Sequence, residues 1–60
     1  MVKFRVNFME RSPLETTASH WELLNGNTLH FFNLGKSLSK QTELVLGPNT
    51  YWTTFERKED

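Results

Sequence analysis

The sequence predicts a mainly β fold: a small antiparallel five-stranded meander that curls into a barrel or half-barrel. Three observations support this prediction. Apolar and polar residues alternate over 2–8, the loop sequence Asn-Gly-Asn at 25–27 separates two apolar segments, and a second turn at 47–49 joins two further segments rich in aromatic and β-branched residues. A chain of 60 residues has the length of one small domain, so we expect a single domain over 1–60.

The first element is a half-buried strand. One side of it is apolar and the other largely polar, which is the period-two pattern of a strand with one face on a core. The turn-forming residues that follow, 10–13, end it. The apolar side consists of Val2, Phe4, Val6 and Phe8.

Residues 13–24 support two interpretations. Ser12 and Pro13 form a good helix start, which gives an alternative α+β fold with one helix over 13–24 packed on a four-stranded antiparallel sheet. Thr16 and Thr17 argue against that helix, because β-branched side chains lose χ1 freedom in a helix interior. We therefore prefer a hairpin around the 25–27 loop.

The register of this hairpin follows from the separation of its two faces. A three-residue loop at 25–27 places apolar side chains on one face and His20, Glu22, His30 and Phe32 on the other, whereas a two-residue loop mixes them. The three-residue register is therefore predicted. Its pairs are Leu24 with Thr28, Leu23 with Leu29, Glu22 with His30, Trp21 with Phe31, and His20 with Phe32.

A second hairpin is predicted over 43–56, after a polar connection at 34–41. The turn Gly-Pro-Asn at 47–49 has a proline that fixes φ, and it would pair Leu46 with Tyr51 and Val45 with Trp52. The predicted core face is then the sum of these patterns. It holds Val2, Phe4, Val6, Phe8, Trp21, Leu23, Leu29, Phe31, Leu44, Leu46, Tyr51 and Phe55.

Composition narrows the classes of function. Seven basic residues balance seven acidic ones, so the chain lacks the basic excess of a dedicated nucleic-acid binder. It has no cysteine and only two histidines, which leaves self-association or a partner chain as the means of stabilising so small a domain. No stretch reads as a signal peptide or a membrane span, so we expect a cytoplasmic protein that does not bind membranes.

Three residues of the first hairpin could carry chemistry. His20, Glu22 and His30 share one face, where two imidazoles and a carboxylate could bind a divalent metal or act as an acid/base pair. The simpler interpretation, a cross-strand surface contact, is preferred. The sequence contains no recognisable nucleophile motif or glycine-rich phosphate loop. We therefore expect no enzyme activity, no metal and no cofactor.

The strand pattern places some apolar residues outside the predicted core, where they could contact a partner. Adjacent residues on a strand point to opposite faces, so only one member of each adjacent aromatic pair can enter the core. Two interpretations remain: this second face binds a partner, or a loop, the tail or 14–18 folds over it. The predicted partner-binding residues are Phe32, Val45, Trp52, His30 and Arg5.

These features favour a non-catalytic protein-binding module: a small adaptor, inhibitor or accessory subunit that self-associates or binds another protein. The alternative is a single-stranded nucleic-acid-binding small β-barrel. In that case bases would stack on Phe32 and Trp52 beside Lys3 and Arg5.

Overall fold

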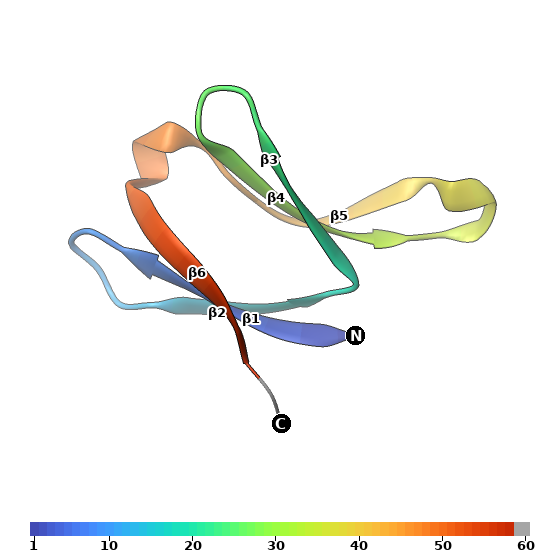
Figure 1. The fold of residues 1–60 in the computed structure, drawn as a ribbon, viewed down its shortest axis with the longest axis horizontal. Coiled ribbons are helices and arrows are strands. Elements are labelled where there is room, and N and C mark those ends of the chain that lie inside the picture. Colours follow the sequence, from blue (N-terminus) through green and yellow to red (C-terminus); the bar gives the residue numbers. More distant parts are fainter. Residues whose placement is uncertain (59–60) are drawn as a thin grey trace.

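A computed structural model describes residues 1–58, which form two three-stranded antiparallel sheets (Figure 1). The first sheet has the strand order β2-β1-β6, and the second has the order β3-β4-β5. The mainly β class is confirmed, but residues 1–58 form six strands in two open sheets and not a five-stranded barrel. The strands are β1 (Val2–Phe8), β2 (Leu14–Ala18), β3 (His20–Leu24), β4 (Thr28–Leu34), β5 (Lys40–Leu46) and β6 (Trp52–Lys58).

The extra strand arises because the segment before the 25–27 loop is divided at Ser19. Residues 14–18 pair with β1 in the first sheet, while 20–24 pair with β4 in the second. The backbone N–H of Ser19 donates to Oδ1 of Asn33 at 2.8 Å, which satisfies a donor that no strand pairs at this corner. The alternative helix over 13–24 is therefore wrong.

The hairpin formed by β3 and β4 has the register that the sequence predicts. All five predicted pairs are present, from Leu24 opposite Thr28 to His20 opposite Phe32. Gly26 and Asn27 adopt positive φ values of 77° and 62°, as the loop chemistry requires.

The predicted second hairpin is wrong. β5 pairs with β4, and β6 crosses to the other sheet and pairs with β1, so Leu46 and Val45 do not pair with Tyr51 and Trp52. A 3-10 turn, η2 (Pro48–Thr50), separates the two strands, and Tyr51 after it has a φ of 59°. The backbone N–H of Met9 bonds the carbonyl of Tyr51 at 3.0 Å, which fixes the start of β6 beside the end of β1. A second 3-10 turn, η1 (Lys36–Leu38), connects β4 to β5.

The core lies between the two sheets. Phe4 of β1 and Phe31 of β4 meet there with ring centroids 5.0 Å apart, and Phe55 of β6 contacts both rings. The buried core residues are Phe4, Val6, Phe8, Ala18, Leu29, Phe31 and Leu46, with Val2, Leu44, Trp52 and Phe55 packed against them.

Three residues predicted in the core are instead largely exposed. Trp21 and Leu23 are 49% and 56% exposed because β3 has a neighbour on only one side, and Tyr51 is 67% exposed because it belongs to a turn. Two residues join the core unexpectedly, Ala18 and Trp52. Within residues 1–58, no helix has the length and apolar character needed to cross a membrane.

Candidate functional site: the outer face and free edge of the second sheet

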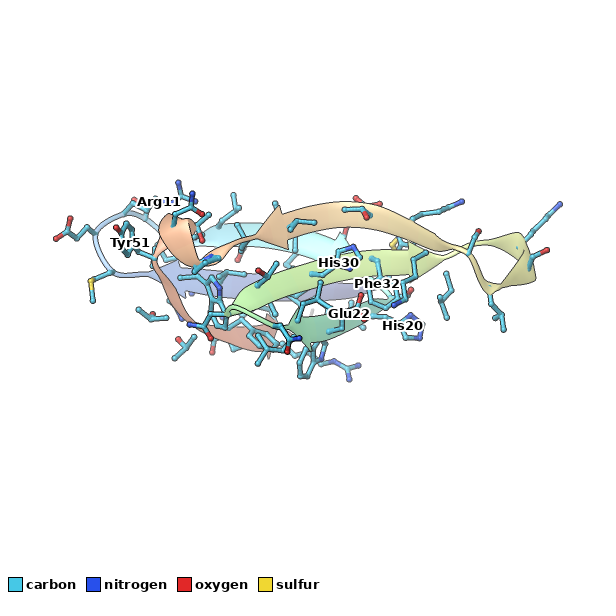
Figure 2. The ribbon with its side chains drawn as sticks, turned by 90° about the horizontal axis from the view of Figure 1, so that it is seen from above. Arg11, His20, Glu22, His30, Phe32 and Tyr51 are labelled. Carbon is cyan, nitrogen blue, oxygen red and sulfur yellow. The ribbon has the colours of Figure 1, made fainter. Side chains whose placement is uncertain are left out.

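The outer face of the second sheet carries a connected set of polar side chains. Nδ1 of His30 lies 2.7 Å from Oε2 of Glu22, and Nε2 of His30 lies 2.8 Å from Oγ1 of Thr42. Nζ of Lys40 donates to the two Glu22 oxygens at 3.0 and 3.1 Å. Strands β3, β4 and β5 each contribute to this network, so it joins all three across the sheet. Figure 2 shows Glu22 and His30 close together on this sheet.

A β-bulge brings Thr42 into the network. Phe31 pairs with Leu44, but the next residue, Phe32, pairs with Thr42, so Glu43 is an extra residue on β5. The bulge allows Leu44 to face the core while Thr42 faces outward beside His30. Sequence alternation alone would have placed Thr42 and Leu44 on the same face.

The electrostatics of the network give each group a defined role. The pKa of Glu22 is held below its ordinary value, first by the hydrogen bond from His30 and then by Lys40, against the opposing effect of partial burial. Glu22 is therefore ionised at neutral pH and acts as an acceptor. It follows that Nδ1 of His30 donates to Glu22, which leaves Nε2 free to accept from the Thr42 hydroxyl when the ring is neutral.

Phe32 lies beneath this polar layer. The His20 ring stacks on it at a centroid distance of 5.6 Å, His30 lies at 5.0 Å, and Nζ of Lys40 lies 5.1 Å from its centroid. Phe32 is only 6% exposed, so the prediction that it is an exposed anchor is wrong. Side chains of its own sheet cover it, whereas the second interpretation of this face places a loop, the tail or 14–18 over it.

The order Thr42–His30–Glu22 has the hydroxyl–imidazole–carboxylate connectivity of a nucleophile triad. Acyl-transfer chemistry also needs a substrate cavity and donors that stabilise an oxyanion. Three surface cavities, of about 390, 330 and 510 Å³, are lined by other residues, and the first lies between Arg11 and Tyr51 at the other end of the molecule (Figure 2). Because the network connects side chains of all three strands of this sheet, we interpret its hydrogen bonds as holding the sheet together.

The three side chains considered as possible metal ligands, His20, Glu22 and His30, do not converge on one point in the structure. His20 turns onto the ring of Phe32, while His30 and Glu22 bond each other. Across residues 1–58, no group of three or more histidine, cysteine or acidic side chains is placed to hold a metal ion.

The structure brings three of the five predicted partner-binding residues together. His30, Phe32 and Val45 lie on the outer face of the second sheet, where Val45 is opposite His30 and 50% exposed. Arg5 belongs to the first sheet, where its guanidinium lies 3.2 Å from Glu15.

Trp52 is also separate from this face. A bulge between Asn7 and Phe8 makes Thr53 an extra residue, so Trp52 and Phe55 both turn toward the core. The indole N–H of Trp52 donates to the carbonyl of Asn27 at 2.8 Å. The prediction that Trp52 lies outside the core is therefore wrong.

The free edge of β3 is the feature that sequence reasoning missed. The Trp21 ring contacts Phe55 across the two sheets at 4.8 Å, yet half of its surface remains exposed, together with much of Leu23 and Leu24. The sequence pattern assigns Trp21 and Leu23 to the inner face, and the contact of Trp21 with Phe55 agrees with that assignment. Their exposure follows from strand order, which alternation within a strand does not reveal.

Comparisons with protein-family models, with curated proteins and with solved structures found no match. The candidate site therefore stands on its geometry alone.

Proposed function

We propose that this chain is a non-catalytic protein-binding module that binds its partner along the free edge of β3. The observation that carries the proposal is the distribution of apolar side chains. Among residues 1–58, ten large hydrophobic residues are exposed while only eight hydrophobic residues are buried. Exposed apolar side chains that lie together on a surface typically mark a site that another protein covers.

The edge of β3 is the place where this apolar surface meets an open strand. Trp21, Leu23 and Leu24 are all exposed there. Exposed backbone N–H and C=O groups on an edge strand can pair with a strand of another chain, and alternate side chains then add specificity. An apolar edge strand therefore offers both hydrogen bonds and buried area to a partner.

Two of the other edge strands, β5 and β6, carry features that discourage such pairing. β6 ends in the charged run 56–58, and β5 has Lys40, Glu43 and a bulge. Charges and bulges protect edges from unwanted strand addition. On β3 the acidic side chain, Glu22, is already bonded to His30 and Lys40, so its charge is directed toward its own sheet.

The polar network on the outer face supports this function indirectly. It ties β3 to β4 through the Glu22–His30 bond and to β5 through Lys40. An edge held in its strand conformation before binding loses less conformational entropy when a partner adds to it. We therefore assign the network a positioning role.

The test is a matched pair of variants. Leu23→Lys places a charge on the proposed edge, and Leu38→Lys places the same charge on the exposed turn η1, away from it. We expect cross-linking in extract of the native host to yield protein adducts of the wild-type chain, and purified samples to self-associate. Leu23→Lys should remove both the adducts and the self-association, whereas Leu38→Lys should retain both. Equal adducts and equal self-association for both variants would contradict the proposal.

An oligonucleotide arm addresses the nucleic-acid alternative. We expect no shift of a labelled single strand at physiological salt, since the aromatic rings expected to stack bases, Phe32 and Trp52, lie buried or against the core. Tight binding that Leu23→Lys leaves unchanged would favour the nucleic-acid function instead.

A further inference from the structure

We infer that the strand added at this edge is β3 of a second copy of the chain, antiparallel to the first about a two-fold axis at Glu22. The inference rests on the proposed function and names its partner. It joins two second sheets into one continuous six-stranded sheet.

The sequence of β3 is complementary to itself in this register. The five residues His-Trp-Glu-Leu-Leu pair so that Trp21 lies opposite the partner's Leu23, and the same contact recurs on the other side of the axis. Both side chains face inward in each copy, so the pairing extends the apolar layer between the sheets. His20 lies opposite the partner's Leu24 on the outer face, where a ring can pack on an aliphatic side chain.

Other registers fit less well. A shift by one residue would place Trp21 opposite the partner's Glu22 and bring inner and outer faces together. An axis at Trp21 would pair Leu23 with Ser19, which is the corner before β3, and an axis at Leu23 would pair Trp21 with Asn25 of the loop. The axis at Glu22 is the arrangement that uses all five residues of the strand.

The charges permit this symmetric contact. Two copies of a chain with formal net charge zero have no long-range repulsion to overcome. The two Glu22 carboxylates meet at the axis, and like charges opposite each other are destabilising when free. Here each carboxylate is bonded to Lys40 and His30 of its own sheet, so the charge at the axis is compensated.

Cysteine cross-linking tests the register, because the native chain has no cysteine. A residue on a two-fold axis meets its own copy, so we expect Glu22→Cys to form a disulfide-linked dimer under mild oxidation. The matched control is Leu38→Cys on the exposed turn η1, which should remain monomeric. Since residue 22 also belongs to the polar network, a second pair keeps the network intact: mixed His20→Cys and Leu24→Cys chains should form the heterodimer in preference to either homodimer.

Sedimentation of the wild-type chain completes the test. We expect a concentration-dependent dimer whose dissociation constant rises by about tenfold or more in Leu23→Lys, as for an interface anchor. A wild-type chain that stays monomeric at the highest attainable concentration would overturn the inference, as would a dimer whose cross-links form at other positions. If the chain is monomeric but its protein adducts still disappear in Leu23→Lys, the inference that the partner is a second copy is wrong. The proposed function would then still hold.

Discussion

Phe31 and Phe32 are adjacent on β4, and both are buried, but they are buried by different means. Phe31 faces the first sheet and is enclosed by the aromatic rings of Phe4 and Phe55. Phe32 faces outward, where His20 and Lys40 lie over its ring. The inner side of the strand is buried by apolar packing. On the outer side, the rings and aliphatic stems of polar side chains cover the Phe32 ring.

This difference teaches that side chains of a small sheet can themselves bury an aromatic ring on its outer face. Long polar side chains can bury an aromatic ring while their charged ends stay in contact with water or with each other. The expected cost of disturbing each side differs accordingly, since a cover of flexible side chains can collapse onto a gap and a packed core cannot.

The largest expected effect is on the inner face. Phe31→Ala should destabilise the fold by about 3–5 kcal/mol, because it leaves a cavity among rings from both sheets. A loss of that size is enough to unfold a domain of marginal stability. Circular dichroism and a one-dimensional proton spectrum should report an unfolded chain. A well-dispersed spectrum for this variant would mean that the space between the sheets is not the main source of stability.

The next effect is on the outer face. Phe32→Ala should cost roughly 2 kcal/mol, less than Phe31→Ala, because His20 and Lys40 can move into the space. Urea denaturation of both variants in a stabilising buffer would measure the difference. Equal costs would show that the outer layer is as rigid as the core.

A smaller effect is expected at Lys40, where two substitutions distinguish the contribution of the aliphatic stem from that of the charge. Lys40→Met retains most of the aliphatic cover over Phe32 but removes the bonds to Glu22, whereas Lys40→Ala removes both. We expect Lys40→Met to cost about 1 kcal/mol at most, in line with exposed ion pairs, and Lys40→Ala to cost more. Thermal melts of the two variants give the order. A larger loss in Lys40→Met would mean that charge, and not cover, holds the outer face.

The smallest expected effect is a dependence of stability on pH. The pKa of Glu22 is lowered in the folded chain by its bond from His30 and by Lys40, relative to an ordinary value of 4.5. The folded state therefore binds the Glu22 proton less readily than the unfolded state does. Its contribution to stability is complete above the unfolded pKa and is lost as the pH falls through the lowered folded pKa.

Glu22→Gln provides the comparison for this pH effect. Melting temperatures of the wild type and the variant should differ near neutral pH and converge as the solution is acidified through that range. A constant difference at every pH would assign the loss to the altered shape of the side chain.

The sequence predicts one part of the fold to the residue and fails on another, for a physical reason. The β3–β4 hairpin is local, and one register separates its apolar and polar side chains, so Trp21 opposite Phe31 could be predicted. The turn after β5 has equally good hairpin chemistry, but Tyr51 with positive φ directs the chain to β1 instead. Partners distant in sequence, such as Val6 and Phe55, decide that pairing, and turn residues do not encode them.

The candidate site was predictable to the same limited degree. The Glu22–His30 contact followed from the register and is confirmed at 2.7 Å. The exposure of Trp21 and the inward turn of Trp52 could not be predicted, because the first depends on which strand lies at the edge and the second on a bulge. Assigning side chains to faces by simple alternation along a strand fails wherever a bulge adds one extra residue to that strand.

The pairing of β1 with β6 sets the order in which this molecule can be completed during synthesis. These two strands pair with each other, although they lie at opposite ends of residues 1–58 (Figure 1). β1 leaves the ribosome before β6, with only the β2 side of its sheet available, and Phe4 and Val6 lack the cover of Phe55 until β6 emerges. The entropy cost of closing so long a loop comes before the stabilising contacts between β1 and β6 can form. The core between the two sheets therefore cannot be fully enclosed until translation reaches β6. Until then only the pairs of consecutive strands, β1–β2, β3–β4 and β4–β5, have both partners present to hold the apolar residues of the nascent chain together.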